Sequence, residues 1–217
     1  FEDVGLWKRA RYFPRAGEDM HAAVARECLA VRSTCGIFDA STLGKIAVVG
    51  PDAAEFLNRL YINSWTNLAA GRARYGILLR EDGFIYDDGV VARTAPDRFH
   101  VTTTTGGAAR VLTMMEDYRQ TEWSELNVWL TSTTEQWAVI AVQGPLARSV
   151  LQPLVAGIDI STGALPHMGV ASGTICGIPM MLFRVSFSGE LGYEINVPAD
   201  CGRAVWEAVY TSGAAHG

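Results

Sequence analysis

The chain has 217 residues, 49% of them hydrophobic and 19% charged, which is enough apolar material for a sizeable core and too little charge for a disordered chain. Its length fits one large domain or two small ones. Eighteen basic and 23 acidic residues give a net charge of −5, which disfavours nucleic-acid binding, and no apolar run is long enough to cross a membrane.

The sequence shows no secretory leader, because no basic segment leads into an apolar one near Phe1. Its four cysteines lack CxxC spacing, which is typical of ordinary thiols rather than of a disulfide framework or a zinc site. Its four histidines show no metal-ligand spacing either. We therefore expect a cytoplasmic globular protein without a metal centre.

The first predicted element is a helix over residues 19–33, and a short apolar strand over 46–49 follows it. The strand ends at Gly50-Pro51, after which Ala53 and two leucines share one helical face. Proline fits a first helical position because its missing N–H would have no partner there. This pattern predicts a strand running into a helix.

The rest of the first half predicts a hairpin, a strand and a helix. The hairpin turns at the dipeptide Asp82-Gly83, which is typical of tight turns. The predicted elements are strands over residues 74–80, 84–93 and 98–103 and a helix over residues 107–118. Residues 127–133 lead on to the second half.

The same order recurs 94 residues later, starting from an apolar run that ends at Gly144-Pro145. The second copy predicts strands over 139–142, 171–175, 179–187 and 192–197, and helices over 145–154 and 201–210. We therefore predict an α+β fold with a duplicated strand-helix-hairpin-strand-helix unit, its pseudo-repeats at about 45–120 and 138–212. Ligands of duplicated folds collect groups from both halves, so functional residues are expected in each.

Paired carboxylates, Asp87 and Asp88, lie inside the otherwise apolar strand after Gly83. Adjacent strand residues point to opposite faces, so one of the two faces the interior or a cleft. Burying a carboxylate is expensive unless it has a partner. The pair is therefore either structural, capping a loop or pairing with an arginine, or part of a functional site.

A second candidate segment runs from Arg184 and reads R-V-S-F-S-G-E-L-G-Y-E-I, with Glu194 early in an apolar strand. A carboxylate there accepts two parallel hydrogen bonds from a planar edge, which a guanidinium or a pterin offers. Glu194 is therefore either part of an internal Arg–Glu pair or a ligand-binding carboxylate. The threonines at 102–105 either cap the helix that follows or place hydroxyls near an anion.

Both segments resemble the aminomethyltransferase family, the glycine-cleavage T-proteins. The family's G-G-x-x-D-D hairpin matches the spacing from Gly83 to Asp88, and its R-x-G-Y-T-G-E-x-G-[YF]-E signature matches the segment from Arg184. Three further segments are similar in sequence to one branch of this family: residues 1–32, DASTLGKI and VTTTTGGAARV. That branch is the C-terminal folate-binding part of heterotetrameric sarcosine oxidase alpha subunits.

The resemblance implies a T-protein-like tetrahydrofolate-binding domain, with Asp88 as the catalytic carboxylate near folate N10 and Glu194 on the pterin edge. Tyr75, Thr104 and Phe187 fall at further folate-contacting positions. The last two depart from the family, which has an asparagine and a tyrosine there, so their polar contacts differ. Family members continue into a segment with a folate-contacting arginine and a C-terminal β-barrel, so we expect residues 1–217 to be a fragment of a larger subunit.

The implied reaction is capture of the iminium from sarcosine oxidation as 5,10-methylenetetrahydrofolate. No flavin signature occurs in the sequence, so flavin and NAD are expected on other parts of a hetero-oligomer with a flavin-bearing beta subunit and small subunits. One alternative is a stand-alone aminomethyltransferase that uses a lipoyl carrier protein. Another is a non-catalytic folate-binding protein, whose K-G-C-Y-x-G-Q-E signature differs from F-S-G-E-L-G-Y-E here.

Overall fold

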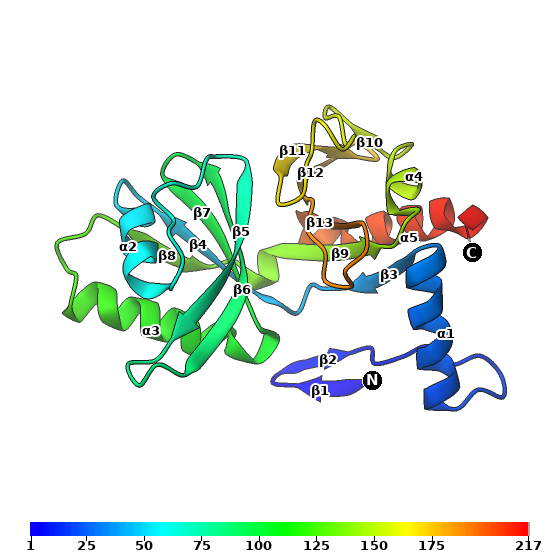
Figure 1. The fold of residues 1–217 in the computed structure, drawn as a ribbon, viewed down its shortest axis with the longest axis horizontal. Helices are drawn as coiled ribbons and strands as arrows, with labels where there is room; N and C mark the ends of the chain where they lie inside the picture. Colours follow the sequence, from blue (N-terminus) through cyan, green and yellow to red (C-terminus); the bar gives the residue numbers. More distant parts are fainter. Residues whose placement is uncertain (217) are drawn as a thin grey trace. The chain divides into compact units, whose positions relative to one another are not determined.

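The computed structural model describes residues 1–216, which divide into two compact units (Figure 1). Unit 1 consists of Phe1–Ser41 together with the residues from Gln136 onward, and unit 2 is Thr42–Glu135. The chain therefore begins in unit 1, forms the whole of unit 2 and returns to unit 1.

Unit 2 is a five-stranded antiparallel sheet in the order β5-β6-β7-β4-β8. Its elements are β4 (Gly44–Val49), α2 (Ala53–Leu60), β5 (Arg72–Leu79), β6 (Ile85–Ala95), β7 (Arg98–Thr103), the 3-10 turn η1 (Thr105–Gly107), α3 (Ala108–Thr121), β8 (Trp129–Ser132) and η2 (Thr134–Gln136). Both α-helices pack against the same face of the sheet. The core between them consists mainly of Phe56, Leu57, Val111, Met115, Ile46, Leu78, Val91 and Val101.

Unit 1 contains a six-stranded sheet in the order β10-β11-β12-β13-β9-β3. Its elements are β1 (Glu2–Val4), β2 (Trp7–Arg9), α1 (Met20–Ser33), β3 (Gly36–Asp39), β9 (Trp137–Gln143), α4 (Ala147–Leu151), β10 (Val155–Ala156), β11 (Val170–Ile175), β12 (Ile178–Phe183), β13 (Gly192–Pro198), η3 (Ala199–Cys201), α5 (Gly202–Gly213) and η4 (Ala214–His216). Helices α4 and α5 cover one face, where the core includes Val150, Leu151, Val205, Val209, Ile140, Val142, Tyr193 and Ile195.

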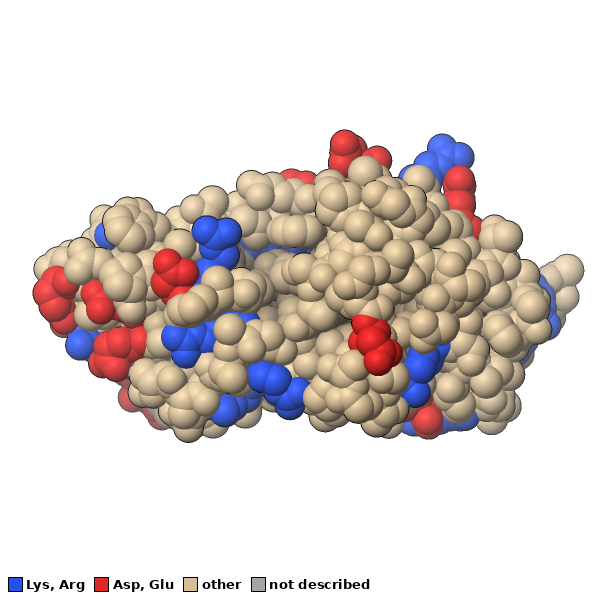
Figure 2. Space-filling model, turned by 90° about the horizontal axis from the view of Figure 1, so that it is seen from above, with Lys and Arg blue, Asp and Glu red and all other residues tan. Residues whose placement is uncertain are grey.

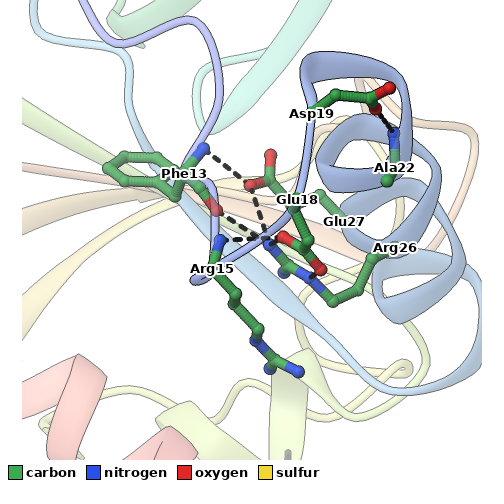
Figure 3. Close-up of polar contacts among 7 residues, drawn as sticks. All are labelled: Phe13, Arg15, Glu18, Asp19, Ala22, Arg26 and Glu27. Atoms are coloured by element: carbon green, nitrogen blue, oxygen red, sulfur yellow. Dashed lines mark hydrogen bonds and ion pairs between the residues drawn. The ribbon is translucent and has the colours of Figure 1, made fainter.

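Arg26 in α1 ties the segment before the helix to the helix itself (Figure 3). Its guanidinium donates to the Glu18 carboxylate and to the Phe13 carbonyl, each at 2.8 Å, and the Glu27 carboxylate accepts the Phe13 N–H at 2.7 Å. The hydrogen bond from Arg26 lowers the pKa of Glu18 to about 2. Asp19 caps α1 by accepting a first-turn N–H at 2.8 Å, and the helix runs as predicted.

The strand order confirms the predicted duplication. The order β11-β12-β13-β9-β3 in unit 1 repeats the order β5-β6-β7-β4-β8 in unit 2. In each copy the first strand (β9 or β4) lies between the last strand (β13 or β7) and an added strand (β3 or β8). Backbone hydrogen bonds at the Gly-Pro turns also recur 94 residues apart. The Gly50 N–H donates to the Asp97 carbonyl and the Gly144 N–H to the Leu191 carbonyl, both at 2.8 Å.

The prediction that proline is the first helical residue is wrong in both copies. Helix α2 starts at Ala53 and α4 at Ala147, so each proline lies in the turn before its helix. Each turn is made by the preceding glycine, with φ of 141° at Gly50 and 129° at Gly144. These angles favour glycine and redirect the chain from strand to helix.

Gly50→Ala and Gly144→Ala should each lower the free energy of unfolding by at least about 2 kcal/mol. The added Cβ would lie 2.2 Å from the Asn127 carbonyl oxygen in the first variant and 2.5 Å from the Thr34 carbonyl oxygen in the second, and both residues would be strained by a positive φ. Gly163→Ala is the matched control, because no atom lies within 4 Å of its Cβ position. Urea denaturation measures all three variants, and equal stability of Gly50→Ala, Gly144→Ala and the control would contradict this account.

Candidate functional site

In unit 2 the structure brings Tyr75 and Asp88 together. Tyr75 on β5 pairs with Val90 on β6 and Ile77 pairs with Asp88, so Tyr75 and Asp88 are diagonal neighbours on one face. The Tyr75 hydroxyl donates a short hydrogen bond to the Asp88 carboxylate. That hydrogen bond raises the pKa of Tyr75 to about 12, so the phenol stays protonated at neutral pH. Because Tyr75 is 49% exposed, the pair is accessible from solvent.

Asp87 and Asp88 face opposite sides of the sheet, as strand alternation predicts. Asp87 pairs with Leu78, which belongs to the helix-covered core, and is only 3% exposed. Asp88 lies on the face away from α2 and α3, with Tyr75. Asp87 is therefore the buried member of the pair, and Asp88 is the member that lies on the other face of the sheet.

Gly89 and Thr102 interrupt the regular hydrogen-bond pattern between β6 and β7 next to Asp88. A Cβ on Gly89 would lie 2.1 Å from the Thr102 carbonyl oxygen, so only glycine allows this approach. The Thr102 hydroxyl replaces ladder bonds by accepting the Val90 N–H at 2.8 Å and donating to the Val90 carbonyl at 2.9 Å. Asp88 therefore lies just outside the regular pairing of β6 with β7, which begins at Val91 and Val101.

The threonine segment does not cap α3 with its side chains. Thr104 is exposed and precedes η1 without a side-chain cap, whereas Thr105 is buried and shares a 3.1 Å hydrogen bond with Thr42. The Thr104 N–H donates to the Asp87 carboxylate at 3.4 Å. The predicted site residue Thr104 is thus connected to the carboxylate pair through its backbone.

Two basic side chains lie buried on the same face of unit 2 as Asp88. His100 on β7 pairs with Ala47, two residues from Lys45 on β4, and the two side chains are 6% and 1% exposed. Burial, and then the charge of Lys45, lower the pKa of His100 to about 4. The imidazole is therefore neutral near pH 7.

Glu194 lies in unit 1 on the sheet face away from α4 and α5. It pairs with Ala141 on β9 and Phe183 on β12, while its neighbours Tyr193 and Ile195 point into the helix-covered core. Phe38 on β3 pairs with the other edge of Ala141. On this face the half-buried Glu194 carboxylate and the Phe38 ring thus lie on either side of Ala141.

Phe187 extends this aromatic surface, because its ring meets Phe38 edge-on at a centroid distance of 6.4 Å while it is 86% exposed. It lies in the loop between β12 and β13, since β12 ends at Phe183 rather than at 187 as predicted. Phe38 was not predicted as a site residue. Its strand has only four residues, and its place beside β9 depends on long-range pairing.

Other signature residues hold this loop in place. Glu190 forms a 2.9 Å ion pair with Arg32 of α1. The Ser188 hydroxyl donates to the buried Gln143 side chain at 3.2 Å. Gly192 leaves room for Gln143, whose Oε1 would lie 2.2 Å from an added Cβ.

Two pockets of unit 2 have linings that do not include Tyr75 or Asp88. One, of about 440 Å³, is lined by Arg80, Phe84, Ile85, Tyr86 and Arg110, and another, of about 320 Å³, by Glu81, Asp117, Tyr118, Thr121, Glu122 and Trp123. Basic and acidic residues are interspersed on the face shown in Figure 2. Within residues 1–216, no helix is long and apolar enough to span a membrane, and no group of three acidic, histidine or cysteine residues is placed to hold a metal ion.

The model of the GCVT N-terminal domain family matches residues 1–217. The chain belongs to this family. It is 56% identical over 98% of its length to the sarcosine oxidase subunit alpha of Corynebacterium sp. strain P-1, and 48% identical over its whole length to that of Rhizobium meliloti strain 1021. It spans only 22% of those two proteins.

More distant relatives are aminomethyltransferases. The chain is 36% identical over 96% of its length to a probable aminomethyltransferase of Haloarcula marismortui and spans 55% of it. The aminomethyltransferase T structure from Bartonella henselae has a TM-score of 0.74 at 30% identity, with 86% of this chain and 48% of that chain covered. A chain of the heterotetrameric sarcosine oxidase of Corynebacterium sp. U-96 shares the fold, with a TM-score of 0.61 at 15% identity and coverage of 88% and 91%. These matches confirm the predicted family and the T-protein-like fold.

The raised pKa of Tyr75 gives a direct test of its contact with Asp88. Asp88→Asn removes the negative charge that opposes phenolate formation, so the pKa of Tyr75 should fall from about 12 towards the ordinary tyrosine value of about 10. NMR titration of protein labelled at the tyrosine ζ carbon measures this change, and Tyr75→Phe assigns the signal. A Tyr75 pKa that stays the same in Asp88→Asn would show that the contact is not formed in solution.

Proposed function

We propose that the chain is the tetrahydrofolate-dependent one-carbon transfer domain of a sarcosine oxidase alpha-like subunit. It would capture the iminium carbon formed by sarcosine oxidation as 5,10-methylenetetrahydrofolate. The observation that carries this proposal is the accessible Asp88 carboxylate, held by the Tyr75 hydroxyl on the helix-free face of its sheet. The similarity to sarcosine oxidase alpha subunits over nearly the whole chain supports the substrate assignment.

Asp88 is proposed to act on the transferring carbon. Tetrahydrofolate supplies two nitrogens, N5 and N10, that take up the one-carbon unit. After N5 takes up the carbon, its bond to the glycine nitrogen would break, glycine would leave, and ring closure would release a proton from N10. The Asp88 carboxylate would accept that proton and stabilise the positive charge on the carbon, which is typically worth about 10²–10⁴-fold in rate. Tyr75 fixes the carboxylate in one orientation and, with its raised pKa, remains a donor throughout.

Glu194 is proposed to bind the pterin. Its surroundings fit such a ring, because Phe38 lies across Ala141 from the carboxylate and Phe187 extends the aromatic surface. The carboxylate would accept two parallel hydrogen bonds from the ring N–H and the exocyclic amine. Phe187 contributes apolar contact without a hydroxyl, and Thr104 is proposed as a further folate contact.

The amine oxidation is assigned to other parts of the assembly. We propose that flavin and NAD lie outside this chain, on a flavin-bearing beta subunit and on other regions of a cytoplasmic hetero-oligomer. The similarity to sarcosine oxidase alpha subunits, of which this chain spans only 22%, supports this arrangement. The chain would then be one domain of a longer subunit.

A second candidate function is aminomethyl transfer from a carrier protein. It is favoured by the 36% identity to a probable aminomethyltransferase and by the structural match to aminomethyltransferase T. Both functions use the same folate site and differ in the donor of the carbon. Supplying the full-length protein with sarcosine or with an aminomethyl-loaded lipoyl carrier distinguishes them by which donor yields methylenetetrahydrofolate.

The roles of the two carboxylates predict different defects in the full-length complex. Glu194→Gln places an amide donor against the pterin donors and should weaken folate binding by about 1–3 kcal/mol, up to roughly 150-fold in Kd. Asp88→Asn should leave folate Kd nearly unchanged and lower methylenetetrahydrofolate formation by about 10²–10⁴-fold, because the loss is confined to the transition state. Calorimetry and product analysis measure the two effects.

Glu207→Gln is the matched control, since it removes only an exposed ion pair with Arg203 on α5 and should leave both quantities unchanged. Peroxide formation from sarcosine should survive all three changes, because this domain is not assigned the oxidation. Loss of folate binding in Asp88→Asn together with normal binding in Glu194→Gln would show that the roles are wrongly assigned.

A further inference from the structure

Asp87 is the only carboxylate that is buried among residues 1–216, and one of its oxygens is left without a hydrogen bond there. Its Oδ1 accepts the Asp88 N–H at 2.9 Å and the Thr104 N–H at 3.4 Å, whereas Oδ2 has no polar partner in the described chain. Burying a charged oxygen in this way is costly. A role beyond packing explains why a carboxylate stands at this position.

The unpaired oxygen lies against the beginning of α3. A Cβ added to Gly107, which precedes the first residue of the helix, would lie 1.9 Å from Asp87 Oδ2 and 2.8 Å from Cγ. The carboxylate therefore fills the space that a side chain at 107 would take. The positive end of a 14-residue helix partly offsets its buried charge. Asp87 is fixed between the helix start and the backbone of β6.

These contacts connect Asp87 to two proposed site residues at once. On one side its Oδ1 holds the backbone of Asp88, whose side chain emerges on the opposite face of the sheet. On the other side it holds the backbone of Thr104. A shift of Asp87 would therefore move both residues relative to a bound ligand, and a displacement of about 1 Å can lower a rate by about 10²-fold.

We infer that Asp87 is a positioning residue: its buried carboxylate, held against Gly107, fixes the backbone of Asp88 and Thr104 so that the Asp88 side chain is presented in one orientation. The inference rests on the proposed function, because it assigns Asp87 a part in the reaction through Asp88. Asp87 itself does not contact the substrate.

The test measures kcat, KM for tetrahydrofolate and folate Kd for sarcosine-dependent methylenetetrahydrofolate formation by the full-length complex. Asp87→Ala should lower kcat by about 10- to 100-fold because Asp88 is misplaced, while Kd and KM change less than about threefold because the proposed pterin contact, Glu194, is untouched and Thr104 is only a further contact. Asp87→Asn keeps the shape and the Oδ1 acceptor, so it should restore kcat to within about threefold of the unaltered protein.

Gly107→Ala displaces the Asp87 carboxylate, and also the Thr104 hydroxyl 2.7 Å from the same Cβ position, without changing any charge. It should reproduce the kcat loss of Asp87→Ala. Gly106→Ala is its matched control, because nothing lies within 4 Å of that Cβ position, and it should behave like the unaltered protein. Thermal unfolding and unaltered folate Kd verify that each variant is folded. Amide hydrogen exchange at Asp88 should accelerate in Asp87→Ala and Gly107→Ala and remain slow in Gly106→Ala.

Asp88→Asn separates the two possible failures. If Asp88→Asn keeps full kcat, the proposed function is wrong. If Asp88→Asn loses turnover while Asp87→Ala and Gly107→Ala keep it, the proposed function stands and the positioning role of Asp87 is overturned. An Asp87→Asn variant as slow as Asp87→Ala would also overturn it, because the charge rather than the held geometry would then be what matters.

Discussion

The alternation of side chains along a strand determines where both candidate carboxylates lie. Each unit packs two helices against one face of a sheet, so every second residue of a strand enters the core and its neighbours turn to the other face. Asp88 and Glu194 both occupy the second set, on β6 and β13. A shift of register by one residue would bury them and expose the core, so the packing that stabilises each unit also fixes its functional face.

Close backbone approaches at three glycines extend this constraint to the details of the sites. Gly89 lets β7 approach β6 beside Asp88, Gly107 leaves room for the Asp87 carboxylate, and Gly192 leaves room for Gln143 under the signature loop. A side chain at any of these positions would require a neighbour to move by an ångström or more. Two of the three neighbours, Asp87 and Gln143, are polar side chains that contact site segments, so glycine at these positions serves geometry rather than flexibility.

The repeated order of elements was predictable, because the Gly-Pro turns and the Asp82-Gly83 hairpin are local signals. The alternation of Asp87 and Asp88 was predictable for the same reason, and the family resemblance directed attention to Asp88 and Glu194. Strands β1, β2, β3, β8 and β10 were not predicted, because they have two to four residues each and too little periodicity to detect. It also missed Phe38 and the contact of Asp87 with Gly107, since both depend on pairing between segments distant in sequence.

In the proposed function, Glu194 recognises the pterin while Asp88 acts near N10. A crystal structure of the full-length protein with a non-reactive tetrahydrofolate analogue tests these two roles. We expect the Glu194 carboxylate to accept hydrogen bonds from the pterin ring N–H and exocyclic amine, and Asp88 to be the carboxylate nearest to N10. A pterin bound with that edge away from Glu194, or an N10 out of reach of Asp88, would contradict the proposed roles.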